Sequence, residues 1–170
     1  MPMYNEEETI GSVVTRTLRY VDEVICIDDG SSDSSARIAE ACGATVIRHR
    51  VNRGYGGALK TLFLEATKLD ADALVLLDSD GQHETGDIPK LLKPILDGEA
   101  DFAIGSRFVD GGGGTDMPAY RRLGIKVITA ASNLSSDLGI KDTQSGFRAF
   151  SRTALESLRF YSEGMELSLE

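Results

Sequence analysis

The chain of 170 residues lacks the features that mark several classes of protein. Its two cysteines, Cys26 and Cys42, are too few for a disulfide framework. Cys26 lies in an apolar segment and Cys42 just before Gly43, so we expect both thiols to be buried, reduced and inert. No apolar run approaches the roughly 18 residues of a membrane span, and no signal peptide is visible. We therefore expect a soluble protein.

Basic residues are also scarce. The sequence has 18 Lys and Arg against 27 Asp and Glu, which gives a net charge of −9. Binding to a nucleic-acid backbone needs basic stripes, so this balance argues against nucleic acid as a partner. An anionic substrate would need a metal ion or local arginines to offset the negative field.

What is present is typical of a globular α/β domain. A hydrophobic content of 41% supports a real core, and this length fits one domain. Helical and extended patterns alternate, which predicts a mostly parallel sheet flanked by helices. We expect helices over Glu6–Tyr20, Ser34–Cys42, Ala58–Leu69, Ile88–Leu96 and from about Tyr120 to Leu134. We expect strands over Val24–Asp28, Thr45–His49, Ala73–Asp78 and Phe102–Gly105, and the segment Thr143–Phe150 completes the pattern.

The two ends of the chain are unusual. The segment from Pro2 to Glu7 reads as a strand-to-helix turn, yet almost no strand precedes it. Either the chain begins late relative to its gene, or residues 1–4 form a very short strand. The last six residues stop inside an amphipathic pattern. We expect a domain truncated at both ends.

Two predicted strands end in acidic residues, Asp28-Asp29 and Asp78-Ser79-Asp80. Side chains alternate along an extended segment, so Asp78 and Asp80 would share one face. Carboxylates at the mouth of an α/β sheet suit a divalent cation that keeps positions for water and a substrate's phosphates. The alternative is that the acids cap a turn and the following helix. Two such strand ends favour a single ligand held between them.

Six short motifs follow one another along the chain: Pro2-x-Tyr4-Asn5-Glu6-Glu7, Asp28-Asp29-Gly30-Ser31-Ser32-Asp33, Asn52-Arg53-Gly54-x-Gly56, Asp78-x-Asp80-Gly81-Gln82-His83, Gly105-Ser106-Arg107 and Ser145-Gly146-Phe147-Arg148. In this order they resemble the family-2 glycosyltransferases of GT-A fold, especially the branch similar to dolichol-phosphate mannosyltransferase. Each motif is weak alone, but the ordered set is specific and covers nearly the whole chain. The resemblance implies that residues 1–170 form one nucleotide-sugar-binding domain with a GT-A, Rossmann-like fold.

The resemblance also implies a set of donor-binding residues. The first turn would line the nucleotide base and ribose, and Asp29 would contact the same part of the ligand. The glycine-rich segment after Arg53 would let backbone approach the nucleotide closely. The candidates are Pro2, Tyr4, Glu6, Ile27, Asp29, Arg53, Asp78, Ser79, Gln82 and Arg107. In the alternative interpretations, Glu6 only enriches a helix N-terminus in acid, and the glycines only form a turn before a helix.

Asp78 and Asp80 match the family's D-x-D element, which implies a Mg²⁺ or Mn²⁺ site. Asp80 would bind the metal directly, and Asp78 would bind metal-bound water or the ribose. The ion would neutralise charge on the departing diphosphate.

The catalytic candidates are Asp80, Arg107, Asp142 and Arg148. The guanidinium fork of an arginine suits phosphate contact, and Asp142 lies where the family has an acid near the transfer site. Arg121 and Arg122 are either acceptor contacts or a solvated pair, and His83 is either functional or a solvated loop histidine.

The reaction implied is inverting transfer of a hexose from a nucleoside-diphosphate sugar, GDP-mannose or UDP-glucose, to a polyprenyl or dolichyl phosphate. A phosphate monoester is already an anion at neutral pH, so it needs no general base. The only histidines are His49 and His83, and neither is an obvious base; Asp142 or a missing C-terminal residue is the alternative base. We expect a cytoplasmic enzyme of cell-envelope or protein glycosylation, working at the inner face of a membrane, as a monomer or a homo-oligomer.

Two other functions are weighed against this one. A nucleotidyltransferase would need a lysine- and glycine-rich turn after the first strand, and the turn at residues 2–5 has neither residue type. A nucleotide-sugar-binding or regulatory domain without transfer activity stays open, because truncation could remove the acceptor elements.

Overall fold

The computed structural model describes residues 1–106, 124–128 and 146–157. The predicted site residues Arg107 and Asp142, with Arg121 and Arg122, lie outside these ranges. No helix in the described part of the chain is long and apolar enough to cross a membrane.

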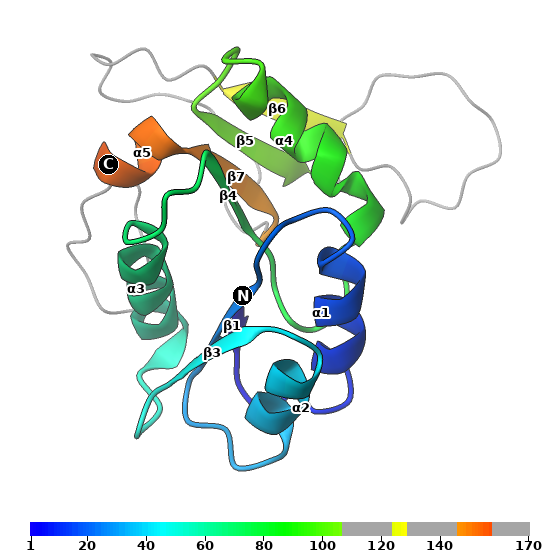
Figure 1. Ribbon diagram of the computed structural model, residues 1–170, viewed down its shortest axis with the longest axis vertical. Helices are drawn as coiled ribbons and strands as arrows, with labels where there is room; N and C mark the ends of the chain where they lie inside the picture. The colour runs from blue at the N-terminus through cyan, green and yellow to red at the C-terminus, as the bar shows by residue number, and fades with distance from the viewer. Residues whose placement is uncertain (107–123, 129–145, 158–170) are drawn as a thin grey trace, which may run out of the picture.

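The described strands form two sheets (Figure 1). The first is parallel, in the order β1-β2-β3, and the second is antiparallel, in the order β4-β7-β5-β6. The first contains β1 (Pro2–Met3), β2 (Ile25–Asp28) and β3 (Thr45–Arg48). The second contains β4 (Ala73–Leu76), β5 (Phe102–Ser106), β6 (Gly124–Ile128) and β7 (Arg148–Ser151). The α/β class with a parallel sheet is therefore confirmed. The second sheet is antiparallel because β7 lies between β4 and β5.

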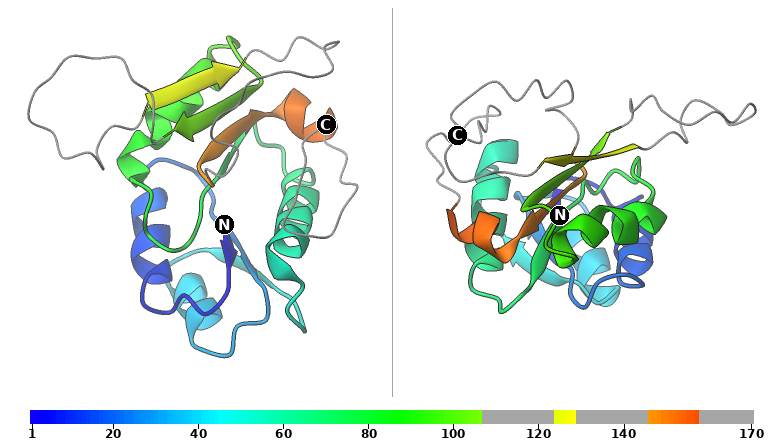
Figure 2. Two further views of the ribbon diagram at one scale, coloured as in Figure 1. Left: turned by 180° about the vertical axis from the view of Figure 1, so that it is seen from behind. Right: turned by 90° about the horizontal axis from the view of Figure 1, so that it is seen from above.

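The helices flank the strands on both sides. They are α1 (Ile10–Thr17), α2 (Ser35–Ala41), α3 (Gly54–Ala66), α4 (Ile88–Leu96) and α5 (Arg152–Ser157), with a short 3-10 helix at Thr85–Asp87. Figures 1 and 2 show α3 on one side of the strands and α1, α2 and α4 on the other. This arrangement covers both faces, as expected where strands connect through helices.

The core has two halves, because alternate side chains along each strand face opposite sides. In β2, Cys26 packs with the α1, α2 and α4 side chains, whereas Ile27 packs with α3. At the end of β4, Leu77 likewise packs in the half of the core with α1, α2 and α4, and Leu76 packs in the half with α3. Strand alternation thus fixes which helix each buried residue meets.

Strand β1 is very short, as one of the two sequence-based interpretations has it. It pairs with β2 in the register Pro2↔Ile27 and Met3↔Asp28. The Ser79 hydroxyl donates a buried 2.9 Å hydrogen bond to the carbonyl oxygen of Pro2, which connects the loop after β4 to β1. This bond brings the ends of the two strands together.

Two helices begin at residues other than predicted. Helix α1 begins at Ile10 rather than Glu6, because residues 5–7 form a turn whose backbone N–H groups donate to side chains of residues 31–35. The N–H of Glu6 donates to the Ser35 hydroxyl, and Asn5 adopts a left-handed φ of 55°. Helix α3 begins at Gly54, a turn before the predicted Ala58. There the Asn52 side chain accepts the Gly54 N–H, which stabilises a helix start that the glycine-rich sequence does not favour.

The predicted helix from Tyr120 to Leu134 is wrong in its described part. Residues 124–128 form β6, which pairs antiparallel with β5 from Phe102↔Ile128 to Ser106↔Gly124. The sequence Gly-Ile-Lys-Val-Ile has the β-branched residues that favour strands, and pairing with a distant strand outweighs the local helical pattern.

The prediction that both cysteines are buried is confirmed for Cys26 but not for Cys42, which is only half-buried.

Candidate functional site

A cleft of about 350 Å³ lies where β1, β2 and β4 end and α3 begins. Its lining residues come from four separate segments of the chain. They are Pro2, Met3, Tyr4, Glu6, Asp29, Asn52, Gly54, Tyr55, Ala58, Asp78, Ser79 and Asp80. Six of the ten residues that the sequence analysis proposes for the donor are in this set, together with the metal candidate Asp80. The carboxyl ends of the strands therefore gather most of the predicted donor residues into one cleft, as is usual in open α/β sheets.

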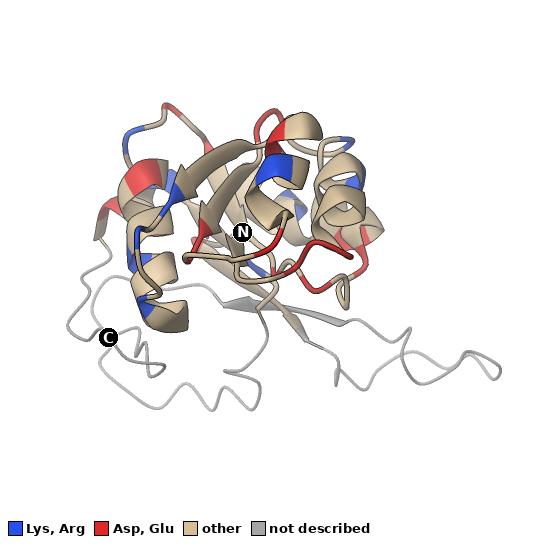
Figure 3. Ribbon diagram, turned by 90° about the horizontal axis from the view of Figure 1, so that it is seen from below, with Lys and Arg blue, Asp and Glu red and all other residues tan. Residues whose placement is uncertain are grey.

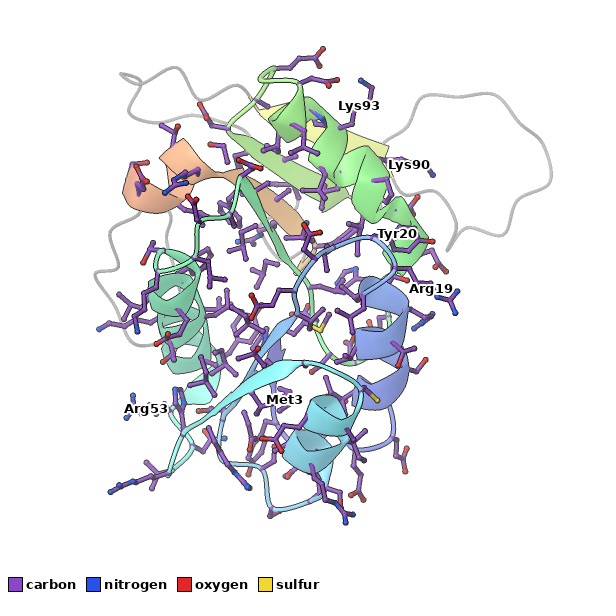
Figure 4. All side chains as sticks on the ribbon, viewed as in Figure 1. Met3, Arg19, Tyr20, Arg53, Lys90 and Lys93 are labelled. Atoms are coloured by element: carbon purple, nitrogen blue, oxygen red, sulfur yellow. The ribbon has the colours of Figure 1, made fainter. Side chains whose placement is uncertain are left out.

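The other described candidates lie around the cleft rather than in its lining. Ile27 is fully buried in the core beside α3. Arg53 is exposed at the start of α3, near the end of β3 (Figure 4). Gln82 is exposed in the loop after β4, where its backbone N–H donates to Asp80 Oδ1 at 2.9 Å. Arg148 is half-buried at the start of β7, in register with Leu76 of β4.

The lining is strongly acidic. Four of its side chains, Glu6, Asp29, Asp78 and Asp80, are acidic, and none of the described lining residues is Lys or Arg. Figure 3 shows acidic residues on several loops that face the viewer at this end of the molecule. A diphosphate entering such a cleft would be repelled unless a cation accompanied it.

Asp29 follows β2 and is 4% exposed. Its Oδ1 accepts a 2.8 Å hydrogen bond from the backbone N–H of Arg53 and lies 2.7 Å from Nδ1 of His49. The neighbouring Asp28 instead supports the turn, because its Oδ1 accepts the Ser31 N–H at 2.9 Å. The two adjacent carboxylates thus have different roles: Asp28 holds the turn, and Asp29 lines the cleft.

Asp78 follows β4 and is held by two side chains. The Tyr55 hydroxyl donates to its Oδ1 at 3.1 Å, and Nε2 of His83 lies 3.5 Å from its Oδ2. Burial acts to raise the pKa of Asp78, but His83, the Tyr55 hydroxyl and the N-terminal ammonium together hold that pKa below its usual value. Burial and then the Asp78 charge raise the pKa of the Tyr55 phenol, while the charge of Arg148 opposes them. Asp78 is therefore an anion at neutral pH with a defined orientation.

Three further residues belong to this site, although the sequence analysis did not assign them to it. Tyr55 sits in the glycine-rich segment, where an aromatic residue among glycines was the available signal. Both histidines are buried, each against a cleft carboxylate: His49 against Asp29 and His83 against Asp78. His83 also stacks on the Phe147 ring at a centroid distance of 5.5 Å. It is thus not a solvated loop histidine.

The residues present fit a divalent metal ion of the Mg²⁺ type. The described residues contain no group of three or more His, Cys, Asp or Glu side chains placed to hold a metal by themselves. Mg²⁺ sites commonly use one or two carboxylates and complete their shell with water and substrate phosphates. Asp78 and Asp80 would supply those carboxylates. Because Asp78 is already engaged by Tyr55 and His83, Asp80 would be the better direct ligand.

A second cavity, of about 480 Å³, opens at the other end of the strands and is lined by residues such as Ile25, Leu74 and Leu96. None of the predicted site residues lines it. The predicted site residues are concentrated in the first cleft.

Comparison with known sequences gives a consistent result. The pattern of glycosyl transferase family 2 matches residues 1–159. The chain is 32% identical over 176 residues to the UDP-N-acetylglucosamine–dolichyl-phosphate N-acetylglucosaminyltransferase of Methanococcus voltae, covering 93% of this chain and 70% of that protein. It is 32% identical over 182 residues to the dolichol-phosphate mannosyltransferase of Pyrococcus furiosus, covering 100% and 50%.

Solved structures show the same fold. Glucosyl-3-phosphoglycerate synthase from Mycobacterium tuberculosis, in complex with Mn²⁺, UDP-glucose and phosphoglyceric acid, has a TM-score of 0.64 and 29% identity, covering 98% of this chain and 60% of that chain. The same enzyme with Mg²⁺ and UDP has a TM-score of 0.63 and 28% identity, covering 94% and 57%. The chain thus spans 50% to 70% of the length of these three proteins. The fold is of the GT-A type, and the chain belongs to glycosyl transferase family 2.

Proposed function

We propose that this chain is the donor-binding domain of an inverting glycosyltransferase, which moves a hexose from a nucleoside-diphosphate sugar to a polyprenyl or dolichyl phosphate. The observation that carries the proposal is the cleft in which Asp29, Asp78 and Asp80 meet the first turn of the chain. Two of the relatives are named for transfer to dolichyl phosphate or for dolichol-phosphate mannose synthesis. GDP-mannose and UDP-glucose are the donors to test first.

In this proposal the nucleoside binds near the first turn. Tyr4 is 50% exposed and lines the cleft, so its ring is available to stack on a base. Glu6 and Asp29 are acceptors for N–H groups of the base or for ribose hydroxyls.

Asp80 and Asp78 would hold Mg²⁺ or Mn²⁺ against the diphosphate. When bound, the ion neutralises phosphate charge and stabilises the departing nucleoside diphosphate. The chain's own part is to present Asp80 to the ligand and to keep Asp78 ionised and fixed through Tyr55 and His83. The acidic lining supports this role, because it offers a diphosphate no positive side chain among the described residues.

The acceptor proposal follows from the state of the histidines. Both are buried and neither lines the cleft, so neither is placed to remove a proton from an acceptor alcohol there. A phosphate monoester needs no such base at neutral pH. Arg148, with Arg107, would orient phosphate groups, and Asp142 would lie near the transfer site. The acceptor places the reaction at a membrane surface.

The second candidate is a nucleotide-sugar-binding domain without transfer activity, because the cleft described above accounts for donor binding and not for an acceptor. Calorimetric titration of UDP, GDP, UDP-glucose and GDP-mannose, with and without Mn²⁺, tests the donor site that both candidates share. We expect one nucleotide series to bind, with Mn²⁺ strengthening the binding. Absence of binding for every compound would refute both. Slow Mn²⁺-dependent hydrolysis of the bound sugar would favour the enzyme over the binding domain.

A further inference from the structure

His49 is the first residue after β3, and it is 6% exposed. Both of its ring nitrogens have partners. Nδ1 lies 2.7 Å from Asp29 Oδ1, and Nε2 lies 2.8 Å from the Thr61 hydroxyl on α3. The ring therefore links the end of β2 to α3 through two short contacts, in a position that almost excludes water.

The hydrogen-bond network assigns the protons of this chain of contacts. An ionised carboxylate only accepts, so Nδ1 carries a proton and donates it to Asp29. The Thr61 hydroxyl can donate or accept, and it also lies 3.1 Å from the carbonyl oxygen of Gly57. Helix α3 thus fixes the position of Thr61. The Thr61 hydroxyl in turn orients the His49 ring, and the ring orients the Asp29 carboxylate.

The two carboxylate oxygens of Asp29 differ in their hydrogen bonding. Within the described part of the chain, its two hydrogen bonds, from His49 and from the Arg53 N–H, both end on Oδ1. Oδ2 is therefore the oxygen available to a ligand in the cleft. A carboxylate held at one oxygen by two donors presents the other in a fixed direction, which lowers the ordering cost of binding.

We propose that His49 is a positioning residue of the donor site, which aims Asp29 at the nucleoside through the Asp29–His49–Thr61 contacts. The inference rests on the proposed function, because it assigns to Asp29 a contact with base or ribose. His49 itself touches no ligand, since it does not line the cleft.

The same three residue types form nucleophilic triads in hydrolases, but this geometry does not suit that chemistry. Thr61 is outside the cleft lining, and its hydroxyl lies within hydrogen-bonding distance of the Gly57 carbonyl oxygen. A nucleophile must reach a substrate and an oxyanion site. The arrangement orients a carboxylate instead.

Two variants of His49 separate its two contacts. In His49→Asn, the amide N–H takes the place of Nδ1–H and can still donate to Asp29. In His49→Gln, the longer side chain takes the place of Nε2 and loses that donor. We expect His49→Gln to weaken metal-free binding of UDP or GDP, whichever the wild type prefers, about tenfold, the size of a lost hydrogen bond to a charged group. His49→Asn should stay within about threefold of wild type.

A double-mutant cycle with Asp29→Ala distinguishes positioning from a general structural role. If His49 acts through Asp29, His49→Gln should cause no further loss of nucleotide affinity in the Asp29→Ala background. Thr61→Val provides a second route should His49→Gln fail to fold. It should weaken binding about threefold, and only when Asp29 is present.

The outcomes are distinct. Wild-type protein that binds no nucleotide would refute the proposed function together with this inference. If the wild type binds nucleotide, three results would overturn only the role of His49. They are a wild-type affinity in His49→Gln, a loss of affinity in His49→Asn equal to that in His49→Gln, and the same loss from His49→Gln in the Asp29→Ala background. Circular dichroism and thermal unfolding of each variant show whether the native fold is kept.

Discussion

Gly146 is packed directly against the carboxylate of Asp78, and Gly146→Ala is the most sensitive steric test of the site. A Cβ atom at Gly146 would lie 1.7 Å from Oδ2, 2.3 Å from Cγ and 2.6 Å from Oδ1 of Asp78. The backbone of Gly146 does not adopt a left-handed φ. The substitution therefore acts through this contact and not through backbone strain.

The contact is too close for small adjustments. Non-bonded carbon atoms prefer a separation of about 3.5–4.0 Å, so the carboxyl group of Asp78 would have to move by more than about 1 Å. That movement breaks its 3.1 Å hydrogen bond from Tyr55. Overpacking of this kind lowers the free energy of unfolding by about 1–3 kcal/mol, which lowers the Tm by roughly 2–12 °C for a chain of this size.

The substitution should also weaken ligand binding. A displaced Asp78 can no longer meet a ligand or a metal-bound water, so we expect Mn²⁺-dependent affinity for the nucleotide sugar to fall about tenfold or more. Calorimetry measures this change, and Gly86→Ala is the matched control. At Gly86 the nearest atom to a new Cβ is Glu84 Oε1, at 3.6 Å, an ordinary contact. Wild-type affinity in Gly146→Ala would refute the placement of Asp78 in the site.

Four further substitutions test individual roles. Asp80→Ala should remove the Mn²⁺-dependent part of donor binding and leave the circular dichroism spectrum unchanged; an unaltered calorimetric affinity with Mn²⁺ would contradict the metal assignment. Asp29→Ala should weaken metal-free nucleotide binding about tenfold, whereas a loss seen only with metal would place this residue in the metal site. Arg148→Lys should reduce turnover more than donor affinity, because lysine keeps the charge but loses the planar fork; an equal fall in donor affinity would assign Arg148 to the donor. Tyr55→Phe should raise the pKa of Asp78, because it removes one of the groups that oppose the effect of burial. The stabilisation from ionised Asp78 is present above its unfolded-state pKa and is lost as the pH falls through the folded value, so in Tyr55→Phe the loss should occur at a higher pH. Carboxyl NMR titration measures this shift, and an unchanged pKa would exclude the contribution of the hydroxyl.

Local sequence pattern predicted those parts of the fold that depend on local chemistry. The strands β2, β3, β4 and β5 and the helix α4 lie within a few residues of their predicted bounds. Strand β6 was predicted as helix, because only its pairing with β5 decides its conformation. The start of α1 depended on Ser35, a hydrogen-bond partner 29 residues away.

The site residues also divide into those that local sequence pattern predicts and those that depend on contacts between distant parts of the chain. Acidic strand ends pointed to Asp29, Asp78 and Asp80, because the carboxyl ends of strands meet at one edge of a sheet. The supporting residues carried no such signal. His49 lies 20 residues from Asp29 in the chain, and Tyr55 lies 23 residues from Asp78. The parallel pairing of β2 with β3 brings His49 to Asp29, and α3 carries Tyr55 to Asp78.

Transfer of labelled hexose to a lipid phosphate tests the central claim most directly. The chain would be incubated with UDP-glucose or GDP-mannose labelled in the sugar, a short polyprenyl phosphate and Mn²⁺, and the labelled lipid would be extracted and counted. We expect a glycosyl polyprenyl phosphate of inverted anomeric configuration, whose formation is lost on removal of Mn²⁺ and in Asp80→Ala. Donor binding without any labelled lipid would contradict the claim of transfer by this chain and leave a nucleotide-sugar-binding domain.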